Sequence, residues 1–328
     1  MENKRTFRTC LIMMTTYNSE KYIRMQIESI INQSFTNWEL IIQDDNSKDN
    51  TMLILKEFEE IESRIKVLSN NDKHGPYFNF HNLINKCKKI KKFDFYMFCD
   101  HDDIWEYNKI NTFIESYDSI SNKDKPIMLY ADMKIINGNN EITANSMNEK
   151  LGMKYQSKWS VFYSHNVFGC NTFFNIDLFN IVPPIDTTYD YCKIMSHDNY
   201  YAKFASVFGQ LIFIDKKLML YRRYENNVTR EQSYSYGLQK FISRIFNISS
   251  LAKAHARTYQ QSIITIDIMI KAKKTKEEDK LLYIKKSLID GGIRGLKTFI
   301  CLRISCGKKI KTISRVIILL SGKYKKYL

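Results

Sequence analysis

Three carboxylates stand together where an apolar segment of the chain ends. Residues 93–105 read FDFYMFCDHDDIW, so a run of aromatic, strand-forming residues leads into Asp100, Asp102 and Asp103. Side chains alternate between the two faces of an extended segment, and Asp100 and Asp102 should therefore project to the same side. Paired carboxylates are ligands that Mg2+ and Mn2+ prefer, with substrate phosphates completing the shell. We expect such a metal site here; the alternative is an acidic turn in which Asp103 caps a helix that starts at Ile104.

A second group of carboxylates follows a second apolar run. Residues 38–43, WELIIQ, lead into Asp44 and Asp45 and then NSKD. An aspartate at this place can accept a hydrogen bond from the N3–H group that uracil and thymine carry and cytosine lacks. The alternative is an N-capping turn formed by Ser47 or Asp49.

The elements that must position these groups alternate along the first half of the chain. Strand-like apolar runs at 9–14, 38–43, 64–68 and 93–99 are separated by helical spacing at 20–33, about 52–61 and 77–89. Such units predict a parallel α/β sheet, which binds ligands at the carboxyl ends of its strands. In the second half we expect a strand at 126–136, two strand-like runs joined by a turn within 160–175, a helix through Val207 and a strand at 211–215.

Two common phosphate-binding motifs do not occur in this sequence. There is no GxGxxG after the first strand and no GxxxxGK[ST] anywhere. If the sheet binds a nucleotide, its phosphates must be neutralised by a metal ion rather than by a glycine-rich loop.

Positive charge is concentrated at the end of the chain. The formal net charge of the 328 residues is +15, yet residues 1–239 hold 29 Lys and Arg against 30 Asp and Glu, while residues 240–328 hold 21 against five. Apolar residues recur there at helical spacing among the lysines, which predicts basic amphipathic helices that lie on an anionic membrane surface. The alternative is an ordinary helical module with a solvated basic face.

The remaining composition favours a cytoplasmic location. Seven cysteines, an odd number without CxxC spacing, predict reduced thiols rather than disulfides or a zinc site. No apolar signal segment opens the sequence, and no run of about 18 apolar residues predicts a spanning helix. We expect a cytoplasmic protein, either free or peripheral on the inner face of the cell membrane.

Several motifs in order resemble those of glycosyltransferase family 2, whose members are inverting enzymes of GT-A fold. The motifs are MMTTYN, QSFTNWELIIQDDNSKDNT and FYMFCDHDDIW, and their wording is most similar to bacterial rhamnosyltransferase-like enzymes of surface-polysaccharide assembly. The resemblance covers roughly residues 8–230. It implies a GT-A catalytic domain at 1–230 followed by a basic, mainly helical region at 231–328.

The same resemblance implies an activity. A sugar, with rhamnose as one candidate, would pass from a UDP- or dTDP-sugar donor to a hydroxyl of a growing cell-surface glycan or a lipid-linked acceptor, with Mn2+ or Mg2+ as cofactor. A nucleotidyltransferase should show a glycine-rich, basic phosphate loop where this chain has TTYNSEKY. A nucleic-acid-binding protein is suggested only by the net charge, and the neutrality of residues 1–239 speaks against it.

On the donor side, the resemblance assigns roles to residues of the motifs. Thr15 and Tyr17 would contact the nucleoside, Asp45 would hydrogen-bond the pyrimidine, and Asp44 joins this donor-binding set. Asn79 resembles a nucleoside-side asparagine, the alternative being a solvated helix position.

The metal ligands would be Asp100 and Asp102. Asp102 is the more direct ligand and Asp100 lies nearer the ribose of the donor. For His101, between them, we favour a packing or hydrogen-bonding role.

On the acceptor side, Asp198 is the candidate catalytic base, because the family places a carboxylate before an aromatic-rich helix; the alternative is a helix cap. The adjacent His197 should support it with a hydrogen bond. The loop around Gly169 would lie near the acceptor, with Cys170 as a buried filler. Arg222 or Arg223 would reach the diphosphate, with surface charge as the alternative.

Overall fold

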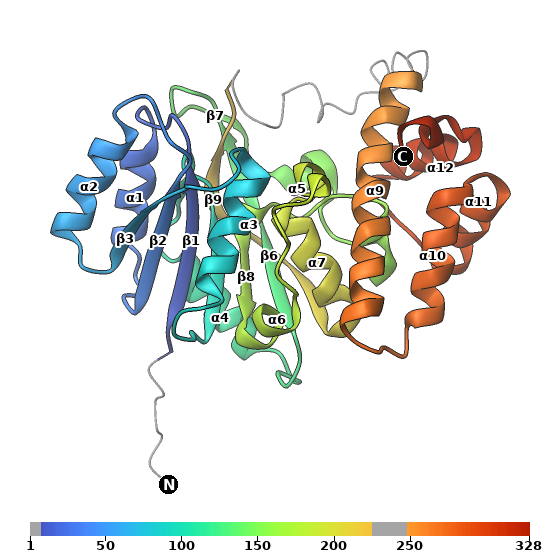
Figure 1. The fold of residues 1–328 in the computed structure, drawn as a ribbon, viewed down its shortest axis with the longest axis horizontal. Helices are drawn as coiled ribbons and strands as arrows, with labels where there is room; N and C mark the ends of the chain where they lie inside the picture. The colour runs from blue at the N-terminus through green and yellow to red at the C-terminus, as the bar shows by residue number, and fades with distance from the viewer. Residues whose placement is uncertain (1–7, 225–247) are drawn as a thin grey trace, which may run out of the picture.

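The computed structural model describes residues 8–224 and 248–328, and its first half is a parallel sheet (Figure 1). Its strands are β1 (Cys10–Thr16), β2 (Trp38–Asp44), β3 (Ile65–Ser69) and β4 (Phe95–Cys99), in the spatial order β3-β2-β1-β4. Every residue of β1 and β4 is buried, as expected for strands covered on both faces. The carboxyl ends of β1, β2 and β4 therefore meet at one edge of the sheet.

The second half continues the sheet with mixed strand directions. The added strands are β5 (Ile104–Trp105), β6 (Ile127–Ile136), β7 (Ile142–Ala144), β8 (Thr172–Asn175) and β9 (Gln210–Arg222). Strand β8 runs antiparallel to both β4 and β6, whereas β6 and β9 are parallel. The predicted α/β class is confirmed, with the parallel arrangement confined to β1–β4 and the β6–β9 pair.

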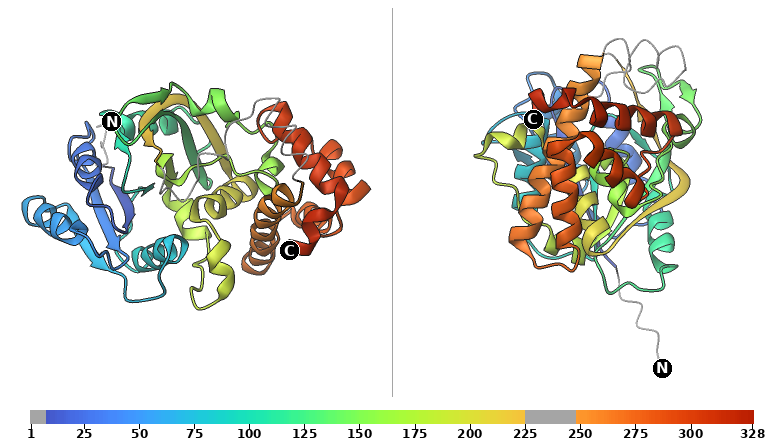
Figure 2. Two further views of the ribbon diagram at one scale, coloured as in Figure 1. Left: turned by 90° about the horizontal axis from the view of Figure 1, so that it is seen from above. Right: turned by 90° about the vertical axis from the view of Figure 1, so that its right-hand side faces the viewer.

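Helices cover both faces of the sheet (Figures 1 and 2). The helices of this part are α1 (Ile23–Ile31), α2 (Thr51–Ile61), α3 (Pro76–Cys87), α4 (Lys109–Asp118), α5 (Met147–Leu151), α6 (Ile176–Ile181) and α7 (His197–Phe208), with short 3-10 turns η1 (Lys158–Phe162), η2 (Gly169–Asn171) and η3 (Asp190–Ile194). Helices α3 and α7 lie on one face, and α1 and α4 on the other. The starts of α3 and α7 both adjoin the sheet edge described above.

The basic end of the chain is helical, as predicted. It comprises α9 (Ile248–Ala272), α10 (Glu278–Asp290), α11 (Gly292–Cys301), α12 (Lys309–Ser321) and the 3-10 turn η5 (Lys323–Tyr327), which form a bundle beside α7 (Figure 1). Gln261 of α9 accepts hydrogen bonds from Ser196 and Asn199 at the start of α7. The predicted boundary between residues 230 and 231 lies outside the described residues, so this division of the chain stays a prediction.

The structure refines the sequence expectations at two places in the first half. The helix expected over residues 20–33 is α1 at Ile23–Ile31, and the Ser19 hydroxyl accepts from the Tyr17 N–H. The alternative in which Asp103 caps a helix from Ile104 is wrong, because Ile104 opens the strand β5.

Two further comparisons concern the second half. The first of the strand-like runs expected within 160–175 is wrong, because the 3-10 turn η1 lies there, started by a Ser157 side-chain cap. The strand expected at 211–215 is confirmed as part of the longer β9, which runs to Arg222.

No helix among the described residues is long and apolar enough to cross a membrane.

Candidate active site

The acidic corner lies directly after β4. Ligand atoms of Asp100, Asp103 and Cys170 lie within 4.8 Å of one another. Oδ1 of Asp103 accepts from the Arg222 N–H at 2.8 Å, whereas Oδ2 is buried and has no hydrogen-bond partner among the described residues. Two carboxylates and an unpartnered buried oxygen fit a divalent cation.

The protonation of this corner reflects its burial. Burial, together with the charge of Asp102, raises the pKa of Asp100 to about 6. Burial and the charges of Asp102 and Asp100 raise the pKa of Asp103 well above its ordinary value. Close carboxylates cannot all ionise cheaply without a counter-charge, and a bound cation reverses this effect.

Asp102, predicted as the more direct metal ligand, is not in the group formed by Asp100, Asp103 and Cys170, because the chain turns after β4 instead of continuing as a strand; its role as a ligand stays a prediction. Its carboxyl group is nevertheless close enough to Asp100 and Asp103 to raise the pKa of both. The side chain of Tyr224 also lies against Asp102, and burial followed by the Asp102 charge raises the pKa of that tyrosine.

Arg222 holds the corner in place, a role that the sequence did not indicate. It is fully buried, and its Nε donates to the Asp102 carbonyl at 2.7 Å while the guanidinium lies 4.3 Å from the centre of the Tyr22 ring. The surface-charge alternative is therefore wrong for Arg222. Its predicted contact with the diphosphate stays a prediction.

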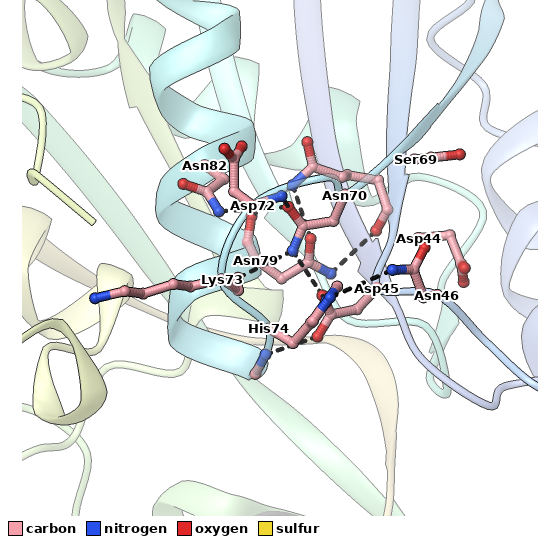
Figure 3. A network of polar contacts seen from close by, with 12 residues as sticks. Asp44, Asp45, Asn46, Ser69, Asn70, Asp72, Lys73, His74, Asn79 and Asn82 are labelled. Atoms are coloured by element: carbon pink, nitrogen blue, oxygen red, sulfur yellow. Dashed lines mark hydrogen bonds and ion pairs between the residues drawn. The ribbon is translucent and has the colours of Figure 1, made fainter. Parts of the chain in front are cut away.

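The second carboxylate group is a network around Asp45, shown in Figure 3. Oδ1 of Asp45 accepts from Asn70 Nδ2 at 2.6 Å and contacts His74 Nδ1 at 2.8 Å, and Oδ2 accepts from the Gly75 N–H at 2.7 Å. A carboxylate offers about four acceptor positions, so one remains on Oδ2. Gly75, at φ +119°, allows the chain to turn from this contact into α3 at Pro76.

Asp44 and Asn79, both predicted on the donor side, are buried and already bonded within the protein. The Asp44 carboxylate accepts from the Thr16 hydroxyl at 2.8 Å and from the N–H and hydroxyl of Ser47. Asn79 exchanges hydrogen bonds with Gln43 of β2, which ties α3 to the strand. The solvated alternative for Asn79 is therefore wrong, and donor contacts by these two residues stay predictions.

The end of β1 adjoins the acidic corner. Tyr17 is 53% exposed, and Thr15, two residues earlier, is buried. His101 Nδ1 lies 3.3 Å from the Thr15 carbonyl oxygen, which joins the two segments. This contact agrees with the hydrogen-bonding role expected for His101.

Asp198 is the second residue of α7, and its carboxylate turns away from the helix axis toward the loop before η2. Oδ2 accepts from the Gly169 N–H at 3.0 Å and lies 3.2 Å from His165 Nε2, while Oδ1 accepts from the Asn199 N–H. Burial alone raises the pKa of Asp198, but the charge and hydrogen bond of His165 outweigh it, and the net result is a pKa well below the ordinary value.

His197 and Gly169 shape this side of the site. His197 stacks on Phe80 with 3.7 Å between ring centres, and its ring nitrogens have no hydrogen-bond partner among the described residues. Its expected supporting hydrogen bond is therefore absent there, and burial lowers the pKa of His197 to about 3. A Cβ atom on Gly169 would lie 2.6 Å from His197 Nε2, so only glycine permits this approach.

The two carboxyl sites are electrostatically linked. The charge of Asp198 contributes to the raised pKa of Asp100, so the candidate base lies near the candidate metal site. Cys170 lies between the two sites, because its thiol is close to Asp100 and the preceding residue, Gly169, donates to Asp198. The Cys170 carbonyl accepts from the buried Lys109 ammonium at 2.7 Å, and burial raises the pKa of the Cys170 thiol. A thiol held protonated is no nucleophile, which agrees with the expected filler role.

Comparisons with known proteins agree on a family. The model described as "Glycosyl transferase family 2" matches residues 11–181, just over half of the chain. The dTDP-rhamnosyl transferase RfbG of Shigella flexneri is 31% identical over 225 residues, which are 65% of this chain and 72% of that protein. The Escherichia coli protein WfgD, named UDP-Glc:alpha-D-GlcNAc-diphosphoundecaprenol beta-1,3-glucosyltransferase, is 37% identical over 128 residues. That match spans 39% of this chain and 47%, less than half, of WfgD.

Solved structures share the fold. Residues 1–349 of S. aureus TarS in complex with UDP-GlcNAc align with a TM-score of 0.55 at 14% identity, covering 96% of this chain and 80% of that one. The mannosyltransferase PcManGT from Pyrobaculum calidifontis, in complex with GDP-Man and Mn2+, aligns with a TM-score of 0.52 at 11% identity, covering 98% and 88%. At these identities the likeness shows the fold, and the GT-A expectation is confirmed.

Proposed function

The chain belongs to glycosyl transferase family 2, and we propose that it transfers a sugar from a nucleoside diphosphate donor to an acceptor hydroxyl in the synthesis of a surface glycan. The observation that carries this proposal is the acidic corner after β4, beside a buried carboxylate, Asp198, at the start of α7. The acidic corner is suited to hold the diphosphate end of a donor, and Asp198 is suited to receive a proton from an acceptor. The curated relatives RfbG and WfgD are named as transferases of this kind.

The donor carries UDP or dTDP. Asp45 supports this choice because its remaining acceptor position suits the N3–H of uracil or thymine, and the three bonds from Asn70, His74 and Gly75 fix its orientation. Thr15 and the exposed ring of Tyr17 complete the nucleoside site. The name of RfbG makes rhamnose one candidate sugar.

A divalent ion, Mn2+ or Mg2+, would be held by Asp100 and Asp102. The buried, unpartnered oxygen of Asp103 and the raised pKa of Asp100 support a cation at this corner. When bound, the ion supplies positive charge that stabilises the leaving diphosphate. Two buried cations hold the backbone around this donor site in place. Arg222 donates to the Asp102 carbonyl, and Lys109 donates to the Cys170 carbonyl.

Asp198 serves the acceptor. In an inverting transfer the acceptor oxygen bonds to the anomeric carbon while the bond from that carbon to the diphosphate breaks, and a carboxylate on the acceptor side accepts the hydroxyl proton. Burial and the Gly169 N–H hold the Asp198 carboxylate in one orientation for this step.

The acceptor is a growing glycan or a lipid-linked saccharide, reached at the cytoplasmic face of the membrane. Support comes from the outer side of α10 and α11, which exposes Leu282, Ile289, Ile293 and Ile300 among Lys286, Arg294 and Lys297. Exposed apolar side chains mixed with cations suit an anionic membrane surface.

Asp198→Asn tests the role of Asp198 as base. Asparagine is nearly isosteric but cannot take the proton, so we expect a loss of transfer of about 100- to 10,000-fold, with binding of the donor nucleotide and Mn2+ within a few-fold of the parent. Nucleotide titration, thermal melting and product formation from a panel of UDP- and dTDP-sugars measure the three quantities. Near-parental transfer by the variant would rule out Asp198 as base, because asparagine caps a helix about as well as aspartate.

A further inference from the structure

Four polar side chains inside the bundle of α9–α12 have no part in the proposed reaction. His255 and Tyr259 lie one turn apart on α9, with 6.2 Å between their ring centres. Lys311 and Arg315 lie one turn apart on α12, which packs against α9 (Figure 1). His255, Tyr259 and Lys311 are buried, and Arg315 is partly buried. These four side chains are named the bundle cluster below.

The guanidinium group of Arg315 lies among the other three side chains. Burial and the charge of Arg315 lower the pKa of Lys311 to about 8 and that of His255 well below its ordinary value. Burial raises the pKa of Tyr259, and the charge of Arg315 opposes that rise. His255 is therefore neutral, and one of its ring nitrogens carries a hydrogen that it can donate.

Two nitrogen atoms of the bundle cluster have donor capacity to spare. Arg315 Nη1 and His255 Nδ1 are buried and have no hydrogen-bond partner among the described residues. The ion pairs of the bundle involve other cations, so no carboxylate of residues 8–224 and 248–328 pairs with Arg315. A desolvated cation without a counter-charge destabilises a fold, and a bound anion removes that penalty. The bundle cluster is therefore suited to bind an anion.

The bundle cluster adjoins the acceptor side of the candidate active site. Lys311 Nζ donates to Asn166 Oδ1 at 2.9 Å. Asn166 follows His165 in the chain, and His165 Nε2 lies 3.2 Å from Asp198 Oδ2. In the proposed transfer the acceptor approaches from the side opposite the leaving diphosphate. An anion held here would therefore belong to the acceptor and not to the donor.

We propose that the bundle cluster binds a phosphate group of the acceptor, so that a saccharide carried on phosphate or diphosphate presents its hydroxyl to Asp198. This inference rests on the proposed sugar transfer and names the chemical class of its acceptor. The phosphate is held and not transferred, so no bond to phosphorus forms or breaks.

The donors of the bundle cluster match the chemistry of phosphate. A guanidinium group presents paired N–H groups to two phosphate oxygens, an ammonium group adds a second charge, and imidazole and phenol supply neutral donors. Because these groups come from two helices, they suit a tetrahedral anion with several oxygens better than a planar carboxylate. Arg315 is only partly buried, so the cluster is accessible to a ligand.

Thermal melting with inorganic pyrophosphate tests the site without turnover. In EDTA, pyrophosphate should raise the Tm of the full chain by a few degrees, because an anion that binds only the folded chain stabilises it. EDTA keeps cations from the acidic corner, whose carboxylates then repel the probe. Arg315→Gln should lose this shift, whereas Arg315→Lys, which keeps the charge, should retain part of it.

Two further variants keep the melting test decisive. Lys309→Gln is the matched control, because Lys309 is exposed on α12, two residues before Lys311 and so on the opposite side of the helix. It removes the same charge and should leave the pyrophosphate shift in place. His255→Phe keeps an aromatic ring but removes the Nδ1 donor, and should lose part of the shift. If Arg315→Gln does not fold, an undiminished shift in His255→Phe would overturn the site.

A pair of acceptors tests the assignment to the acceptor. Both carry the same saccharide and alkyl chain, joined by diphosphate in one and by a neutral ether in the other. The parent should use the diphosphate acceptor with a kcat/KM about 10-fold higher or more, and Arg315→Gln should lose most of this preference through KM. Arg315→Gln should also co-sediment with anionic vesicles as the parent does. Loss of sedimentation with an intact acceptor preference would assign the cluster to a lipid headgroup and overturn the inference.

The outcomes separate this inference from the proposed function. A pyrophosphate shift that Arg315→Gln retains, or equal use of the two acceptors by the parent, would overturn the phosphate site. A parent that transfers no sugar from any donor to either acceptor would instead overturn the proposed function, and the assignment to an acceptor with it. An Arg315-dependent pyrophosphate shift in that parent would still support the anion site itself.

Discussion

At the scale of single residues, the site consists of carboxylates whose surroundings differ. Asp45 and Asp198 each receive three contacts from protein groups, and those of Asp198 hold its pKa below the ordinary value. Asp100 and Asp103 are buried beside other carboxylates and have raised pKa values. The first kind suits recognition of a hydrogen-bond donor or a proton, and the second kind suits a bound cation.

The buried carboxylates of Asp100 and Asp103, with their raised pKa values, predict that activity depends on a metal ion. Asp102→Ala should abolish turnover without unfolding the chain, and EDTA should do the same to the parent, since the carboxylates then lack the ion that stabilises the diphosphate. Product release with and without added Mn2+, together with Tm, measures both effects. Asp118→Ala is the control, because Asp118 loses only an exposed ion pair with Arg8. Full activity in EDTA or in Asp102→Ala would remove the metal from the proposal.

At the scale of elements, helix α7 combines the candidate base with residues that pack in the core. Its N-terminus presents Asp198, while its remaining residues are buried through Val207, among them Lys203. The Lys203 ammonium has no hydrogen-bond partner among the described residues, and burial lowers its pKa to about 7. A buried, unpaired cation destabilises the folded chain.

We therefore expect Lys203→Met to stabilise the protein, most clearly in acid. The folded pKa lies below that of an unfolded lysine, about 10.4, so the unfolded chain binds more protons between these values and parental stability rises with pH there. Below about pH 7 the full penalty applies. The variant should raise Tm by a few degrees at pH 6, and the gain should shrink at pH 9.

Lys109→Met provides a matched comparison for this prediction. Lys109 is equally buried but donates to the Cys170 carbonyl and lies over the Trp105 ring, so its removal should give a smaller gain or a loss. A Lys203→Met variant with lower Tm than the parent at both pH values would show that the ammonium has a stabilising partner.

At the scale of the whole molecule, the candidate site and the excess charge occupy different parts. The candidate donor-side and acceptor-side residues lie at the ends of β1, β2 and β4 and at the start of α7. The helical bundle of α9–α12 lies beside the sheet domain, next to α7 (Figure 2). Because Gln261 joins α9 to the start of α7, a membrane-bound bundle would hold the site at a fixed distance from lipid-linked acceptors.

Membrane binding can be measured directly. The parent should co-sediment with vesicles that contain anionic lipid but not with neutral ones, and Ile293→Glu/Ile300→Glu should lose this binding, since each change removes apolar contact and adds repulsion. Ile61→Glu on α2 is the control, because Ile61 is similarly exposed, at 78%, far from the bundle in sequence. If the parent and both variants co-sediment equally with anionic vesicles, or if the parent does not co-sediment at all, the bundle does not bind membranes through these residues and serves only in packing.

The sequence by itself determined the class of the fold and the identity of most candidate residues. Buried strands are recognisable from local composition, as in β1 and β4, and the motif order from Thr15 to Asp198 places polar groups where strands end and helices begin. The basic helical end was likewise predictable, because charge and apolar spacing are properties of neighbouring residues.

Only the tertiary structure decided which partners these residues meet. Asp198 pairs with His165, 33 positions earlier, and the Asp102 backbone with Arg222, 120 positions later. The sequence signals neither contact, since a hydrogen bond across the fold depends on how loops and strands are brought together rather than on local spacing. For the same reason, Asp103 does not cap a helix: its carboxylate accepts from the Arg222 N–H of β9, a segment far along the chain.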